Sequence, residues 1–160
     1  MLQISFSLPA PSSPWWNTWE SAKQRDVASL SEMDLCYRYF EVDVEMVVGG
    51  AEIISSPRYL TLVDLALSLQ GVMELIAIGK DAEFGFTESG EIIYLDSTGD
   101  VVSVSSSDHE LQGTVDREEL MQKLAEFLRV AHLRLVREVP ELVNNPVIQR
   151  IARPLGLGST

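Results

Sequence analysis

The chain has 160 residues, and its 24 acidic side chains outnumber its 12 basic ones, which gives a formal net charge of -12 and an isoelectric point near 4.5. This length fits one domain, and 46% hydrophobic residues suffice for one core. The single cysteine, Cys36, excludes an internal disulfide framework and a cysteine-rich zinc site. We expect a single acidic domain over residues 1–154 and a flexible tail over residues 155–160.

Three features predict a cytoplasmic protein. The N-terminal residues lack the basic region and the long apolar core of a secretion signal. The most apolar stretch, residues 60–78, is interrupted by polar and charged side chains, whereas a membrane span needs about 20 mostly apolar residues. A lone cysteine also fits a reducing compartment.

The N-terminal region combines a strand signal with a proline-rich segment. Residues 2–7 alternate apolar and polar side chains, which predicts a short strand. Residues 9–14 contain three prolines, which predict a loop. Trp15, Trp16 and Trp19 follow, and they could cover the core or, alternatively, anchor an interface, where tryptophan is enriched.

The clearest strand signal lies in residues 35–48, which alternate strictly in their second half. One face of this strand is apolar. The other face carries three acidic residues, namely Glu41, Asp43 and Glu45. Gly49 and Gly50 then predict a two-residue hairpin turn, because both positions accept positive φ, and residues 51–55 return as the partner strand.

The rest of the chain predicts a helix, a meander and two further helices. Pro57 precedes a helix that begins near Thr61 with a capping box. The expected meander strands span residues 83–87, 91–95 and 101–105, and the later helices span residues 116–138 and 146–153. We expect the last helix to cover an apolar stripe of Val130, Leu133 and Val136. The fold class is therefore α+β, with a mostly antiparallel sheet of N-terminal strand, hairpin and meander packed against two longer helices and a short C-terminal helix.

The negative charge is concentrated in the meander. Residues 1–80 carry a net charge of -5, residues 81–115 carry -8, and residues 116–160 carry +1. The middle segment has no lysine or arginine, which departs from the mixed-sign surface that solubility alone favours. Because such a surface attracts positive charge, the expected partner is a basic protein. The same acidic surface repels phosphates, so the sequence predicts neither nucleic-acid nor membrane binding.

The sequence offers no pattern typical of an enzyme, a metal site or a cofactor site. His109 lies beside serines and carboxylates, but sequence neighbours do not form a triad, and a solvated loop histidine is the simpler interpretation. His132 lies in the middle of a predicted helix, where a packed histidine is expected. Carboxylates on one strand face are spaced by about 7 Å, yet glycosidase acids come from different elements. We expect no catalytic residue, no metal and no cofactor.

Residues 35–150 resemble small acidic immunity-type proteins of bacterial polymorphic-toxin systems. The resemblance is of pattern and composition and is carried by residues 40–46 (FEVDVEM), Pro57, and residues 62–66 (LVDLA), 84–86 (FGF) and 139–146 (VPELVNNP). It implies a protein that binds a toxin domain in the producing cell and blocks it. No catalytic residue is implied.

Charge and resemblance together suggest a protein-binding inhibitor that neutralises a basic toxin domain, such as a nuclease, by occlusion. The alternative is an acidic secretion chaperone or adaptor for an effector protein, which would form a homodimer with apolar grooves. The oligomeric state is left open. The expected partner-binding residues are Glu41, Asp43, Glu45, Glu83, Glu88, Glu91, Asp96, Asp100, Trp15, Trp16 and Trp19.

Overall fold

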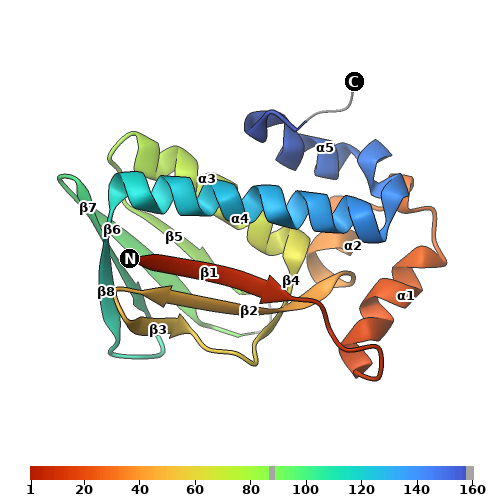
Figure 1. Cartoon of the computed structure of the whole chain (residues 1–160), viewed down its shortest axis with the longest axis horizontal. Coiled ribbons are helices and arrows are strands. Elements are labelled where there is room, and N and C mark those ends of the chain that lie inside the picture. The colour runs from red at the N-terminus through yellow and green to blue at the C-terminus, as the bar shows by residue number, and fades with distance from the viewer. Residues whose placement is uncertain (87–88, 158–160) are drawn as a thin grey trace. The chain divides into compact units, whose positions relative to one another are not determined.

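The computed structural model describes residues 1–86 and 89–157. The chain divides into two compact units. The first comprises Met1–Phe6, Val44–Arg58 and Ser68–Leu124, and the second comprises Ser7–Asp43, Tyr59–Leu67 and the described residues from Ala125 onward. Helices and antiparallel strands both contribute, so the predicted α+β class is confirmed (Figure 1). The single domain and the tail stay predictions, and residues 158–160 of that tail lie outside the described residues.

The strands of residues 1–86 and 89–157 form two four-stranded sheets. In the first sheet the order is β1-β2-β3, and β4 also pairs with β2. Figure 1 shows β1 beside β2 and running in the opposite direction. These strands are β1 (Leu2–Ser7), β2 (Glu41–Val48), β3 (Ala51–Ile54) and β4 (Tyr59–Thr61). The second sheet has the order β5-β6-β7-β8, with β5 (Ala82–Gly85), β6 (Ile92–Thr98), β7 (Val101–Ser106) and β8 (Gln112–Asp116).

In the first unit, the predicted glycine hairpin joins β2 to β3 and lies against β8. Gly49 and Gly50 both have positive φ, at 56° and 86°, which confirms the prediction. A Cβ atom built on Gly113 of β8 would lie 1.9 Å from the carbonyl oxygen of Val48. Because that neighbour is backbone, only glycine permits this close approach.

Two parts of the strand prediction are wrong. Residues 35–37 belong to helix α2 (Glu32–Tyr37) rather than to a strand, because the Ser31 hydroxyl accepts a hydrogen bond from the Asp34 amide and caps a helix there. Phe40 then takes a positive φ of 63° before β2 begins. Strands β4 and β8 were not predicted. β4 has three residues, and the glycine at position 113 hides the alternation of β8.

The predicted helices are confirmed as α3 (Leu62–Ala77), α4 (Arg117–Glu138) and α5 (Pro146–Ala152), and α1 (Asn17–Lys23) is an additional helix. The predicted capping box at Thr61 is not used as expected. The Thr61 hydroxyl donates to the carbonyl of Cys36 at 2.6 Å, and the Glu119 carboxylate accepts from the Leu2 amide at 2.8 Å.

In the second unit, Asn145 ties the C-terminal segment to the loops before α2. Its side chain is fully buried and donates to the carbonyls of Val27 and Leu30 at 2.8 and 3.0 Å. The side-chain oxygen of Asn145 accepts a hydrogen bond from the Val147 amide at 2.9 Å and so caps α5. All the polar groups of this side chain therefore contribute to holding the unit together.

The predicted cover for the apolar stripe on α4 is wrong. Val130 and Leu133 are 55% and 58% exposed. The buried face of α5, with Ile148 and Ile151, packs elsewhere in the core. Val136, the third residue of the predicted stripe, is half-buried.

Candidate functional site: the Glu91 cluster and the outer sheet face

Glu91 is a buried carboxylate in the first unit. It directly precedes β6, and its side chain is only 1% exposed. Glu91 lies on the same strand face as Ile93 and Leu95, which are fully buried, so the alternation of β6 points it inward. Burying a carboxylate is costly unless charged or polar partners compensate for the lost water.

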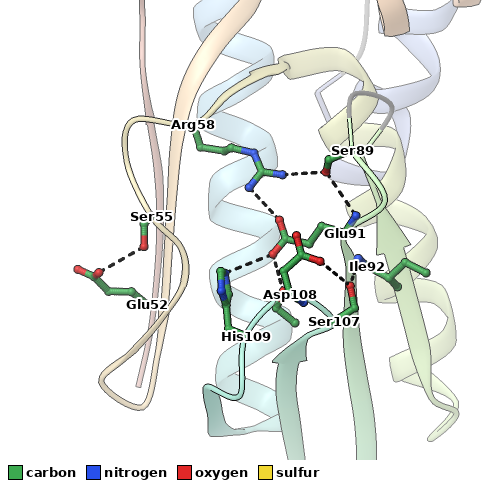
Figure 2. A network of polar contacts seen from close by, with 10 residues as sticks. Glu52, Ser55, Arg58, Ser89, Glu91, Ile92, Ser107, Asp108 and His109 are labelled. Carbon is green, nitrogen blue, oxygen red and sulfur yellow. Dashed lines mark hydrogen bonds and ion pairs between the residues drawn. The ribbon is translucent and has the colours of Figure 1, made fainter.

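Among the residues that the structure describes, three side chains compensate for the water that the Glu91 carboxylate loses on burial. The Arg58 guanidinium lies 2.8 Å from Oε1, while the Ser106 hydroxyl donates to Oε2 and His109 Nε2 lies 3.4 Å from the same oxygen. Figure 2 shows the Glu91 carboxylate between Arg58 and His109. We call Glu91, Arg58, Ser106 and His109 the Glu91 cluster.

Arg58 is held in place by further contacts. Its guanidinium stacks 4.6 Å from the centre of the Phe86 ring, and Phe86 in turn meets Phe84 edge-on. The Arg58 guanidinium also donates a hydrogen bond to the Ser89 hydroxyl at 3.3 Å, and the same hydroxyl accepts one from the Glu91 amide (Figure 2). The segment before β4 is thereby fastened to the start of β6.

The Glu91 cluster has the residue types of a hydrolase triad, but the contacts run in a different order. In a triad the imidazole lies between the nucleophile and the carboxylate. Here Ser106 and His109 both contact the same carboxylate oxygen, and the Ser106 hydroxyl also accepts from the Asp108 amide at 3.1 Å. The hydroxyl hydrogen is therefore bound by Glu91, and the two bonds of the hydroxyl fasten the end of β7 to the start of β6.

The opposite side of the β5–β8 sheet is polar and negatively charged. Strand register places Glu83 beside Tyr94 and Asp96 beside Ser103, with all four side chains exposed or half-buried. We call this surface the outer sheet face. It comprises Glu83, Tyr94, Asp96, Thr98, Val101, Ser103, Ser105, Gln112, Thr114 and Asp116. These four strands contain no lysine or arginine.

The structure separates the predicted acidic residues into two groups. Glu83, Asp96, Asp100 and Glu45 are exposed, and Asp43 is half-buried. Glu91 and Glu41 are buried, so including them in a partner-binding surface was wrong. The Glu41 backbone contacts Thr18 and Trp19, which cover this end of β2. Glu88 lies outside the described residues.

The three tryptophans also differ. Trp19 is fully buried, donates to the Glu41 carbonyl at 2.8 Å and packs edge-on against Phe40, so it belongs to the core and not to an interface. Trp16 is half-buried and stacks on Trp19. Trp15 is 39% exposed and stacks on Tyr59, with ring centres 4.7 Å apart. Of the three, Trp15 offers the largest fraction of its surface to a partner.

Cys36 is buried in α2 and hydrogen-bonds to Asp64. Burial, followed by the nearby carboxylates of Asp64 and Glu32, raises the pKa of the thiol to about 11. Because the thiolate is the reactive form, this thiol is inert at neutral pH. Burial also raises the pKa of Asp64 above its ordinary value.

The burial of His132 predicts that the free energy of unfolding depends on pH. It is 9% exposed, its Nδ1 has no hydrogen-bond partner among the described residues, and burial lowers its pKa below the ordinary value. The unfolded chain therefore takes up a proton more readily than the folded protein. The stability that neutral His132 contributes is complete above about pH 6.5. As the pH drops below that value, the free energy of unfolding should fall by at most about 1.4 kcal/mol per pH unit.

Comparing wild type with His132→Leu by urea unfolding at pH 7 and pH 5 checks this expectation. The variant should gain about 1 kcal/mol at pH 7, because it removes an unsatisfied buried nitrogen. It should gain more at pH 5. An equal effect of the substitution at both pH values would contradict the assignment.

Comparisons with protein-family models, with curated proteins and with solved structures found no match. Among residues 1–86 and 89–157, no three histidine, cysteine or carboxylate side chains converge as metal ligands do. No helix in the described part of the chain has the length and apolar character that crossing a bilayer requires.

Proposed function

We propose that the protein is an inhibitor that binds a basic protein domain through the outer sheet face and neutralises it by occlusion. The observation that carries this proposal is the surface itself. Exposed carboxylates and hydroxyls are distributed over four strands without a lysine or arginine among them. A surface of one sign speeds the approach of an oppositely charged partner, and carboxylates pair well with arginine and lysine.

Glu83 and Asp96 form the centre of this acidic surface. They are diagonal neighbours on adjacent strands, because Glu83 pairs with Tyr94 and Asp96 follows two residues later on the same face. Asp100 and Asp116 lie nearer to Arg117, whose amide donates to the Asp100 carbonyl and whose guanidinium donates to the Gly99 carbonyl. Glu83 and Asp96 are therefore the acidic residues of the outer sheet face to test first.

The Glu91 cluster serves this surface as an internal support. It joins the start of β6 to the end of β7 and so fixes the two central strands of the sheet. A rigid surface loses less conformational entropy on binding than a flexible one. In this proposal Ser106 and His109 act as structural groups and carry out no reaction.

A charge-reversal experiment tests the proposal. Affinity capture at low salt and at 0.5 M salt supplies partners, and each captured protein is then purified and tested for 1:1 binding and for loss of its own activity. The Glu83→Lys/Asp96→Lys variant should associate at least about tenfold more slowly at low salt. The matched control, Glu74→Lys/Glu141→Lys, changes the net charge equally at exposed positions outside the sheet and should have little effect.

Equal association rates of the two variants would contradict the role of the outer sheet face. A captured partner that keeps its activity in the 1:1 complex would contradict inhibition. Salt sensitivity provides a third readout, because exposed ion pairs are screened over about 10 Å at 0.1 M salt.

The alternative function, an acidic secretion chaperone or adaptor, has one structural observation in its favour. That function requires a homodimer with an apolar surface, and Val130 and Leu133 are exposed apolar neighbours on α4. Recovery of a secreted effector bound to a dimer would favour the chaperone over the inhibitor.

A further inference from the structure

The exposed face of α4 carries a short stripe of four residues, with two apolar side chains in the middle and one charge of opposite sign at each end. Within the second unit the stripe consists of Glu126, Val130, Leu133 and Arg137, all of them exposed. Their spacing of four, three and four residues places them within about 60° of one another around the helix axis. This is also the spacing of the seam residues in a coiled coil. We call these four residues the α4 stripe.

The α4 stripe is complementary to itself when two helices run antiparallel. Residues 126 and 137 have the same midpoint as residues 130 and 133, between Ala131 and His132. A two-fold axis through that point places Glu126 opposite Arg137 of a second copy, and Val130 opposite Leu133 of that copy. Ala131 and His132 are buried and face away from the axis.

We infer that this protein forms an antiparallel two-fold dimer of its own chain through the α4 stripe. A second copy fits the stripe because both ends of the seam then join opposite charges while the centre buries apolar side chains. Such self-complementarity is what an isologous interface requires. Arg134 beside the stripe already pairs with Glu138 of its own helix at 3.2 Å, which reduces the positive charge next to the seam.

The dimer should be weak. The stripe spans only about three helical turns and has two apolar residues per copy, whereas a standard stable interface buries about 1,600 Å². We therefore expect a dissociation constant on the order of 100 µM. Sedimentation equilibrium from 10 µM to 1 mM should show a monomer at the lowest concentration and mostly dimer at the highest.

Charge reversal tests the register directly. Glu126→Arg alone places two arginines opposite each other at both ends of the seam, and Arg137→Glu alone places two glutamates there. Each variant alone should be monomeric at 1 mM. An equimolar mixture of the two should restore the dimer, because every end then joins opposite charges, and the double variant should dimerise like wild type.

The result that overturns the inference is a wild-type monomer at 1 mM, or a mixture that stays as monomeric as the single variants. Leu133→Glu should also abolish the dimer. Circular dichroism melting curves show whether each variant is folded, and Glu74→Arg serves as a charge control on an exposed position outside α4. None of these readouts depends on the partner of the outer sheet face.

Discussion

Replacing Gly113 by alanine should destabilise the protein by about 3 kcal/mol, the upper end of the usual cost of overpacking. A Cβ atom at this position would lie 1.9 Å from the carbonyl oxygen of Val48 and 2.6 Å from its carbonyl carbon. Backbone atoms cannot rotate away as a flexible side chain can. Strand β8 would have to shift away from the end of β2, and the β2–β3 turn would lose its packing.

Urea unfolding of Gly113→Ala and Gly71→Ala provides the measurement and its control. Gly71 lies in α3, is exposed, and has no atom within 4 Å of a built Cβ. Alanine there should stabilise the protein by about 0.5–1 kcal/mol, since it favours the helix. A loss of less than about 1 kcal/mol for Gly113→Ala would show that β8 does not approach Val48 as closely as described.

Replacing Glu91 by alanine should cost about 3 kcal/mol, within the range for breaking a buried ion pair. The substitution leaves the buried Ser106 hydroxyl without its acceptor and Arg58 without its counter-ion. Arg58 is 29% exposed and can turn partly toward water, which limits the loss. The exposed Glu83→Ala control should change stability by no more than about 0.5 kcal/mol.

A double-mutant cycle separates the ion pair from the burial of the carboxylate. Arg58→Met alone leaves a buried charge and should be destabilising, whereas Arg58→Met/Glu91→Met removes both charges together and should recover part of that loss. Chemical unfolding of the four proteins measures the coupling. Purely additive effects of the two substitutions would mean that Arg58 does not compensate Glu91.

Elements with a strict side-chain period could be predicted from the sequence. The alternation in β1 and β2, the glycine pair of the hairpin, and the apolar faces of α3 and α4 each depend on residues close together in the chain. By contrast, α2 was hidden because its residues continue directly into the alternating run of β2. The local signs of a helix were the serine cap at position 31 and the acidic residues Glu32 and Asp34 in the first turn.

The candidate site could be predicted only in part. The outer sheet face follows from the lack of basic residues in the meander, which is visible in the sequence. The burial of Glu91 could have been predicted too, since it shares its strand face with Ile93 and Leu95. Its pairing with Arg58 could not, because 33 residues separate them and the two residues adjoin strands of different sheets, whose pairing leaves no periodic signal in the sequence. Glu41 was misjudged because cover by a distant helix leaves no periodic signal.

The thiol of Cys36 makes this protein convenient for spectroscopic labelling. It is the chain's only cysteine, it is 6% exposed, and its pKa is about 11. Maleimide reagents at neutral pH should therefore react far more slowly with Cys36 than with an exposed cysteine. A second cysteine introduced at Asp96 or Leu133 can then carry a fluorophore or spin label by itself, without removal of the native residue. One such probe would report on a partner at the sheet, and the other on a second copy at the helix.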